Sequence, residues 1–497
     1  MSHQSGQQGI GGCCLSRRTF LGAAAALAGA AMAGGCAAEG QRSPPTGAPR
    51  SPLIRPIALG GPASKLVPAV RVAFVRRKGP YGLRWPGAVY DGEAARTMYT
   101  EKILQAAKAM NLKADIRPDP LYTAAEADAW IADAKASAAD GLLVVLLDRQ
   151  EHAWPTASKA IDSGLRTIIY SPLGTSFTTN TAAPSRKTGA VIYSTDDFSQ
   201  AAYGLKMLGA AARMRAARIV VIRGARRAES EFPVLGLHLR TIPARTFADL
   251  YQATPENDEM RAIADEHLAG AQRVIGATRQ DAVNGARSYV VARTILQQEE
   301  ADGITMDCLG ALGPTKLALP CLAWSRMNDE GVPAACEADI GAVASHVIVQ
   351  YLFDRPGFQQ DPVAETSQQA IIGSHCTCAT KLNGFDRPSE PFLIRHHHAE
   401  RDATVQTLWR TGQPVTSVDV EAGGKTGKTR MIIQAGHVLE NVRVPPSGGC
   451  VVPVMVKFDG QADVLANPGF HQVFFYGNYK QHLLDFCRLM NIEPVVA

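Results

Sequence analysis

From residue 69 onward, short runs of branched apolar residues alternate with helical segments, and this alternation constrains the fold of the 497-residue chain more than any other feature. Parallel strands need such a rhythm, because a helix must carry the chain back across the sheet. The first stretch predicts strands at 69–75, 112–116, 141–147 and 166–170, with helices at 93–111, 124–138 and 156–163. We therefore expect a parallel α/β domain over residues 69–190, with helices on both faces of its sheet.

The rhythm then restarts. Strands are predicted at 218–223, 237–242 and 301–309, and helices at 198–212, 246–252, 258–270, 279–299, 316–327 and 340–351. This pattern predicts a second α/β domain over residues 191–350. Together the two stretches indicate two successive Rossmann-like parallel α/β domains.

After residue 360 the helical patterns almost stop. Strands are predicted at 370–378, 392–398, 405–409, 415–421, 429–434, 437–444 and 451–458, and a closing helix at 479–490. Glycine-rich turns separate several of these strands, as in antiparallel sheets. The expected C-terminal domain, residues 351–497, is therefore antiparallel and barrel-like.

Composition excludes several other classes of protein. Apolar residues make up 46% of the chain and charged residues 20%, which is the balance of a globular protein rather than of a disordered or coiled-coil one. No strongly apolar window reaches the length of a membrane span, which excludes a polytopic membrane protein. The net charge of +5 is scattered and aromatic residues are 6%, so we expect no nucleic-acid partner.

The N-terminus resembles a targeting signal. Ser16-Arg17-Arg18-Thr19-Phe20-Leu21 precedes a moderately apolar run at 20–33, as in the twin-arginine export signal. The alternative is a chance Arg-Arg pair in a cytosolic chain. The signal over residues 1–36 predicts a folded protein that the twin-arginine export machinery carries to the periplasm.

The signal ends at Ala33-Gly34-Gly35-Cys36, which resembles a lipoprotein cleavage box. Acylation of Cys36 would anchor the protein to the outer side of the membrane, whereas simple cleavage after Ala33 would release it. Residues 37–68 are rich in proline and predict an extended linker. Seven cysteines lie beyond the linker without any CxxC pair, so we expect buried thiols rather than a zinc ribbon or a disulfide framework.

Two motifs favour structural interpretations. Residues 422–429 loosely match a phosphate-binding loop, but a strand rather than a helix is predicted after them, which favours a basic hairpin turn. His396, His397 and His398 are consecutive on a predicted strand, so their side chains alternate between faces and cannot all bind one ion. We expect them to form a partly exposed strand end.

Cys336-Glu337-Ala338-Asp339 places two carboxylates in an apolar setting just before a predicted helix. Acidic residues there can simply stabilise the helix dipole. However, this segment, with residues 302–309, Pro320-Cys321 and 328–331, resembles the core of the L-fucose isomerase family and, more distantly, L-arabinose isomerase. The resemblance continues through Asp361 and residues 373–376 to His471, and spans residues 69–497.

The resemblance implies a site as well as a fold. In that family carboxylates and histidine hold a divalent cation, typically manganese, and the carboxylates act as acid and base. Carried over by position, Glu337 and Asp361 would be the catalytic carboxylates and metal ligands. His471 would be a further ligand, and His375 resembles a ligand of the arabinose branch. The family also implies a homo-oligomer.

We therefore expect an exported, metal-dependent aldose–ketose isomerase, an intramolecular oxidoreductase that acts on a monosaccharide through an ene-diol. Removal of a weakly acidic sugar proton needs a positioned base, and a cation stabilises the charge that develops. The alternative is a carbohydrate-binding lipoprotein that keeps the fold without turnover. Metal content of the mature protein distinguishes the two.

Overall fold

The computed structural model describes residues 51–79, 81, 91–149, 152–397, 402–423, 427–443 and 450–497. Arg17, Arg18 and Cys36, on which the export and lipidation predictions depend, lie outside these residues. Among the helices that the structure describes, none has the length and apolar character needed to cross a membrane.

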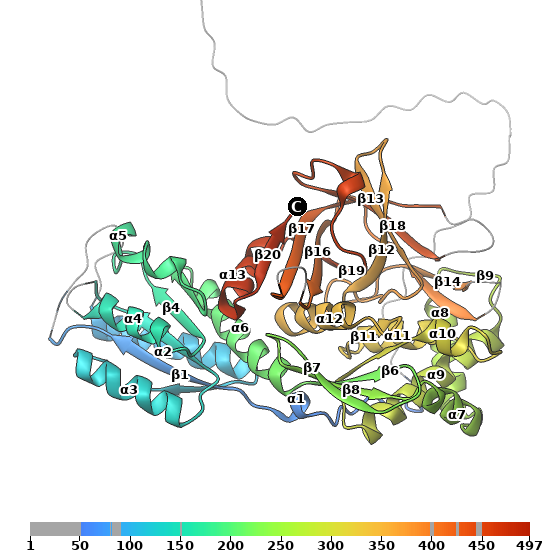
Figure 1. Cartoon of the computed structure of the whole chain (residues 1–497), viewed down its shortest axis with the longest axis horizontal. Coiled ribbons are helices and arrows are strands. Elements are labelled where there is room, and N and C mark those ends of the chain that lie inside the picture. Colours follow the sequence, from blue (N-terminus) through green and yellow to red (C-terminus); the bar gives the residue numbers. More distant parts are fainter. Residues whose placement is uncertain are drawn as a thin grey trace, which may run out of the picture. The chain divides into compact units, whose positions relative to one another are not determined.

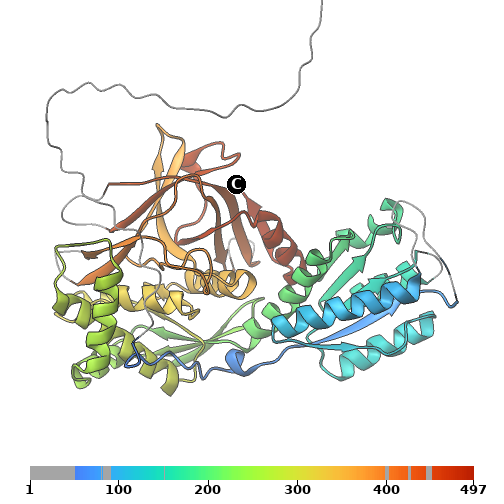
Figure 2. The same ribbon diagram turned by 180° about the vertical axis from the view of Figure 1, so that it is seen from behind.

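The first sheet is fully parallel, as predicted, with strand order β2-β1-β3-β4-β5. Its strands are β1 (Ala69–Val75), β2 (Lys113–Ile116), β3 (Gly141–Leu146), β4 (Thr167–Ser171) and β5 (Ala190–Ser194). Every residue of the central strand β3 is buried, because helices cover both of its faces. Figure 1 shows α3 (Ala124–Ala136) and α4 (Ala153–Asp162) on one side of the sheet, and Figure 2 shows α2 (Gly92–Ala109) on the other.

The second sheet has the order β11-β10-β6-β8-β7. Its strands are β6 (Arg218–Ile222), β7 (Ala228–Phe232), β8 (Leu237–Ile242), β10 (Gly303–Met306) and β11 (Ala334–Cys336). The sheet is parallel except for β7, an unpredicted edge strand that runs antiparallel to β8. The helices of this region are α6 (Phe198–Ala216), α7 (Arg245–Ala253), α8 (Asp258–Gly270), α9 (Arg279–Gln298), α10 (Cys308–Leu312), α11 (Cys321–Asp329) and α12 (Ile340–Phe353).

The C-terminal region forms a closed six-stranded antiparallel barrel, which confirms the predicted architecture. Its strands are β12 (Phe358–Glu365), β13 (Ala370–His375), β16 (Pro414–Glu421), β17 (Arg430–Asn441), β18 (Val452–Phe458) and β19 (Gln472–Tyr476). They pair in the order β16-β19-β12-β13-β18-β17, and a β16–β17 pairing closes the ring. Outside the ring, β20 (Glu493–Val496) runs parallel to β17, after the predicted closing helix α13 (Lys480–Met490).

The barrel differs from the sequence prediction in which strands build it. Strands β12 and β19 were not predicted, and the two strands expected at 429–434 and 437–444 are one strand, β17, with an irregularity between Val438 and Glu440. The strands expected at 392–398 and 405–409 are not in the barrel. They correspond to β14 (Phe392–His396) and β15 (Ala403–Thr407), which form a separate sheet with β9 (Arg273–Ile275).

The residues that loosely match a phosphate-binding loop lie between β16 and β17. These two strands are antiparallel, and Glu421 pairs with Arg430 across the turn. Residues 424–426 lie outside the described part of the chain. Because a strand follows where a phosphate-binding loop needs a helix, the hairpin interpretation is confirmed.

Part of the segment expected to be an extended linker is packed against the second region. Ile54 is 4% exposed and belongs to the apolar core around α8 and α9. The amides of Ala63 and Ser64, in the short helix α1 (Pro62–Lys65), donate to the carboxylate of Asp302 at 3.1 and 3.0 Å. The described residues from 51 onward form one compact unit, and the division into three domains stays a prediction.

Candidate metal centre

Glu337 sits in a strained turn between β11 and α12. Both Glu337 (φ 65°) and Ala338 (φ 53°) have left-handed backbone conformations, although neither is glycine. Each such residue costs on the order of 1–3 kcal/mol and persists only where its surroundings hold it. The next residue, Asp339, caps α12, because its Oδ1 accepts a hydrogen bond from the amide of Ala342 at 2.8 Å.

The barrel holds this turn in place. Gln359, a buried residue of β12, accepts a hydrogen bond from the amide of Cys336 at 2.9 Å and donates to the carbonyl of Cys336 at 3.5 Å. A side chain of the third region thus fixes the last residue of β11, next to Glu337. The left-handed turn is therefore held from both the sheet and the barrel.

Three of the residues expected at the site, Glu337, His375 and His471, converge, and Asp361 contacts one of them. His471 Nε2 lies 3.1 Å from Asp361 Oδ1 and 3.5 Å from Glu337 Oε2. His375, the last residue of β13, has its Nε2 3.7 Å from Glu337 Oε1. One ligand atom each of Glu337, His375 and His471 lies within 4.8 Å of the others.

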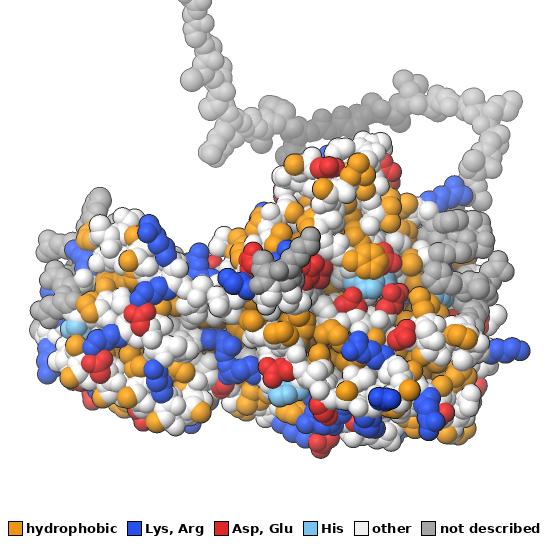
Figure 3. Space-filling model, viewed as in Figure 1, with side chains coloured by type: hydrophobic (Ala, Val, Ile, Leu, Met, Phe, Trp, Pro, Cys, Tyr) orange, Lys and Arg blue, Asp and Glu red, His pale blue; other side chains and the backbone are white. Residues whose placement is uncertain are grey.

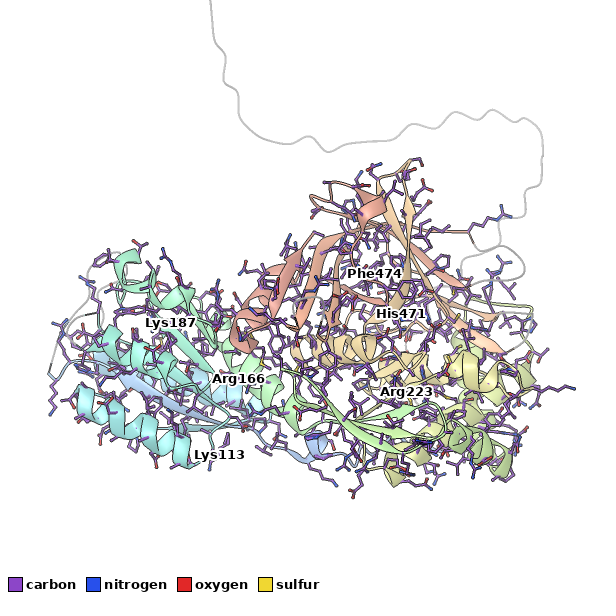
Figure 4. The ribbon with its side chains drawn as sticks, viewed as in Figure 1. Lys113, Arg166, Lys187, Arg223, His471 and Phe474 are labelled. Atoms are coloured by element: carbon purple, nitrogen blue, oxygen red, sulfur yellow. The ribbon has the colours of Figure 1, made fainter. Side chains whose placement is uncertain are left out.

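Figure 4 labels His471 at the end of the barrel that faces α12. On the same side of the molecule, Figure 3 shows histidine and acidic side chains next to each other below the barrel. The site therefore opens where the barrel meets the carboxyl end of the second sheet. This is the edge at which parallel α/β sheets usually bind ligands.

Asp339 adds a contact that the sequence analysis did not assign. Its Oδ2 lies 2.8 Å from His471 Nδ1. A carboxylate that accepts from one ring nitrogen fixes the orientation and tautomer of a histidine and leaves the other nitrogen available as a ligand. In this site the other nitrogen, Nε2, points toward Glu337 and Asp361. The sequence signal was the spacing of the two acidic residues, at 337 and 339.

Charge and burial set the protonation states of these groups. Burial alone would lower the pKa of His471, but hydrogen bonds to Asp339 and Asp361 outweigh it and raise this pKa to about 10. Burial raises the pKa of Glu337, and His471 offsets part of that rise. Burial alone would raise the pKa of Asp361, but the hydrogen bond to His471 outweighs it and holds this pKa below the usual value. The site therefore contains one carboxyl group of raised pKa beside one of lowered pKa.

The residues present fit a divalent cation. Two carboxylates and two imidazoles are the ligands that manganese and similar ions accept, whereas thiolates favour softer metals. Asp361 Oδ1 and His471 Nε2 are buried, and among the described residues their one close polar contact apart from Glu337 is the 3.1 Å approach to each other. Buried polar atoms with so few partners are rare, and a shared cation would satisfy both.

A small cavity adjoins this centre. Glu337 and His375 contribute to its wall, together with His397 and the two leucines Leu309 and Leu319. The remaining lining residues are cysteines, namely Cys308, Cys321, Cys336, Cys376 and Cys450. The sequence predicted buried thiols but did not indicate that five of them meet in one place.

The three consecutive histidines have different environments. His396 Nε2 lies 3.2 Å from Asp281, the residue that completes the capping box of α9, which indicates a structural role. His397 is 4% exposed and lines the thiol-rich cavity, so it is not on an exposed strand end. His398 lies outside the described residues.

No protein-family model matches the chain. Two curated proteins are similar to it, the sulfoquinovose isomerases of Priestia aryabhattai and Priestia megaterium. Each is 22% identical over 232 residues, which are 45% of this chain and 51% of the relative. The chain thus matches about half the length of these relatives.

Proposed function

We propose that the protein is a divalent-metal-dependent sugar isomerase that interconverts an aldose and a ketose. The observation that carries this proposal is the convergence of Glu337, His375 and His471, with Asp361 in contact with His471. The similarity to sugar isomerases supports an isomerase-type enzyme. Its assignment to the L-fucose isomerase type rests on the resemblance alone and is part of the proposal.

The chemistry assigns a task to each carboxyl group. Isomerisation moves a proton between C1 and C2 of an open-chain sugar and a second proton between the two oxygens. Glu337, whose pKa burial raises, is the group suited to take up the carbon-bound proton and return it to the neighbouring carbon. Asp361, whose pKa is lowered, stays ionised and is suited to accept a hydrogen bond from a sugar hydroxyl and so orient it.

Glu337, Asp361, His375 and His471 would hold the cation, with manganese as our first choice. When bound, it would stabilise negative charge on the sugar oxygens during proton transfer. Asp339 holds His471 in one orientation, and Gln359 holds the turn that carries Glu337.

The substrate class that we propose is a monosaccharide. The names of the two relatives point to sulfoquinovose, a sulfonated sugar, as the first compound to test. L-Fucose and L-arabinose follow from the resemblance of the sequence motifs. A homo-oligomer stays part of the proposal, and the oligomeric state of the purified protein tests it.

The decisive experiment measures carbon-bound proton exchange. The mature protein, stripped of metal and then reloaded with Mn²⁺, is incubated with each sugar in D₂O, and NMR follows deuterium at C2 and the growth of the ketose signal. We expect both signals only with the cation present. If Mn²⁺ binds tightly but no sugar exchanges a proton, the metal site remains and the isomerase chemistry fails; calorimetric titration with each sugar then tests the carbohydrate-binding alternative.

We also propose export through the twin-arginine route to the periplasm, with Cys36 as a lipid anchor. Replacing both Arg17 and Arg18 by lysine should trap the precursor in the cytoplasm, because the receptor recognises the guanidinium pair. Normal export of this variant would contradict the route. Mass spectrometry of the mature N-terminus distinguishes an acylated Cys36 from a start near Gly34.

A further inference from the structure

Two thiols meet at the edge of the candidate metal centre. Cys376 follows His375 at the end of β13, and Cys450 lies two residues before β18. The two strands are antiparallel neighbours, and His375 pairs with Val452. The strand pairing thus brings both cysteines to one place, where their Sγ atoms are 3.7 Å apart.

The two cysteines also differ in access. Among the seven cysteines that the structure describes, Cys450 is the one whose residue is not buried. Cys376 is 5% exposed, and both thiols line the cavity that Glu337 and His375 share. A reagent from solution therefore reaches Cys450 first, with Cys376 directly behind it.

Cys336 is a third thiol in the same cavity, but it is hydrogen-bonded to another residue. The Cys336 thiol lies 3.3 Å from Thr377 Oγ1 and donates a hydrogen bond to it. Cys336 is also buried, at 3% exposure, whereas Cys450 is not. Proximity and access thus both favour pairing of Cys376 with Cys450.

We propose that Cys376 and Cys450 form a disulfide with each other when a small disulfide compound such as oxidised glutathione oxidises them. The Cys450 thiolate attacks one sulfur of the oxidant and releases one glutathione thiolate. The Cys376 thiolate then attacks the Cys450 sulfur of the mixed disulfide and releases the second. The cysteines lose two electrons and two protons, and the oxidant is reduced to two thiols.

The geometry requires only a small movement. A disulfide has a sulfur–sulfur bond of about 2.0 Å, so the two Sγ atoms, now 3.7 Å apart, must approach by about 1.7 Å. The bond would tie the end of β13, with His375 on it, to the start of β18. It would also close a long loop in the unfolded chain, which stabilises the folded state. This inference does not depend on isomerase activity.

The test uses the full mature chain. Reduced protein is treated with oxidised glutathione, its remaining thiols are alkylated in acid-quenched, denatured samples, and the digest is analysed by mass spectrometry. We expect a linked peptide that contains Cys376 and Cys450, lighter by two hydrogens than the two separate peptides. The oxidised protein should also melt at a higher temperature than the reduced protein.

Variants separate this bond from other oxidation. Cys450→Ser, at the more exposed position, should lose both the linked peptide and the melting-temperature shift. Cys487→Ser is the matched control, because Cys487 is buried against Met431 and away from the cavity. This control should keep both signals. Cys376→Ser is the companion variant at the buried position. If it fails to fold, the wild-type digest and Cys450→Ser still decide the question.

Three outcomes would overturn the proposal. Cys376 and Cys450 could both remain alkylatable after the oxidant has been added. A glutathione adduct could persist on Cys450, which would show that Cys376 does not complete the second step. Finally, the linked peptide could join another pair, such as Cys308 and Cys336.

Discussion

The two α/β sheets use the carboxyl ends of their strands in opposite ways. In the first sheet, Arg77 follows β1 and Asp148 follows β3, and their side chains form a bidentate ion pair at 2.6 and 2.7 Å. In the second sheet, Glu337 follows β11, and its carboxylate points at His375 and His471 of the barrel region. The first edge joins a cation to an anion, whereas the second gathers ligand atoms that compete for the same space.

This difference teaches how to recognise a site at a strand end. Charged residues at the edge of a parallel sheet are common to both regions, so their presence alone is not informative. What distinguishes the second edge is a left-handed Glu337 and lone pairs from three separate strands or loops directed at one point. Strain and convergence cost stability, and they are retained where a ligand offsets the cost.

The largest predicted effect is on turnover, and it comes from a substitution at the carboxyl edge of the second sheet. Glu337→Gln keeps the shape of the side chain but removes its charge, so turnover should fall by about 10²–10⁴-fold, the range for a lost general base. Mn²⁺ binding, measured by calorimetry, should weaken as well. The melting temperature should hold or rise, because fewer carboxylates are crowded together.

Glu365→Gln is the matched control for that variant. Glu365 lies at the other end of β12, where its carboxylate accepts hydrogen bonds from Ser367. It should leave turnover and metal binding unchanged. Equal turnover in Glu337→Gln and Glu365→Gln would remove Glu337 from the mechanism.

A buried ion pair between α8 and α9 extends the comparison from the sheet edges to the helices. Glu259 is 6% exposed and receives two hydrogen bonds from Arg293, at 2.6 and 2.8 Å, and further ones from Arg55. Glu259→Gln should lower the free energy of unfolding at pH 7 by about 3 kcal/mol, because Arg293 is left buried without its counter-charge. Urea unfolding measures this, and metal affinity should not change.

Glu259 should also make the stability of the folded protein depend on pH. Burial alone would raise the pKa of Glu259, but the two arginines outweigh it and lower this pKa to about 2, from a usual value of 4.5. A lowered pKa stabilises the folded protein above pH 4.5, and this stabilisation is lost as the pH falls toward 2. The difference between wild type and Glu259→Gln should therefore shrink across that window. A constant difference would contradict the assignment.

In the first sheet, Asp148→Asn should cost about 2 kcal/mol of folding free energy. The substitution removes the charge that pairs with Arg77, and Asp148 is 3% exposed, so water cannot fully replace the pair. Thermal or urea unfolding detects the loss. Mn²⁺ affinity should stay at the wild-type value, and a parallel loss of metal binding would erase the contrast between the two edges.

Asp339→Asn should change metal binding and leave stability nearly unchanged. Asparagine caps helices about as well as aspartate, so α12 should keep its stability. However, it removes the negative charge beside His471, and metal affinity should fall by about 10–100-fold, as for other carboxylates behind a ligating histidine. A lower melting temperature with unchanged Mn²⁺ affinity would show that Asp339 is only a helix cap.

The sequence predicted most of the fold because helical and strand periodicity is local. Strands β1 and β8 and helix α8 match their predicted ranges. Strand β12 escaped prediction because it contains Gln359, Gln360, Asp361 and Pro362 instead of alternating apolar residues. Several of its polar groups have tertiary partners instead, such as the amide group of Gln360, which donates to Gln472 at 3.1 Å. No local pattern reveals such a partner.

The site shows the same limit. Its residues were named from a resemblance, because Asp361 lies on the unpredicted strand and His471 just before another. The role of Asp339 was hidden, since its partner His471 is 132 positions away in the chain. Left-handed backbone at Glu337 also gives no sequence signal, because such conformations usually occur at glycine.

The contacts of residues 54–64 have a consequence for the order of events during synthesis. Ile54, Ala63 and Ser64 leave the ribosome long before Glu259 and Asp302, the residues that α1 and its flank engage. These contacts form only after the chain has been made as far as Asp302. A fragment that begins at residue 191 would lack this segment and leave the Asp302 carboxylate without two of its donors. The early segment must therefore wait for residues made 204 to 239 positions later before it can form these contacts.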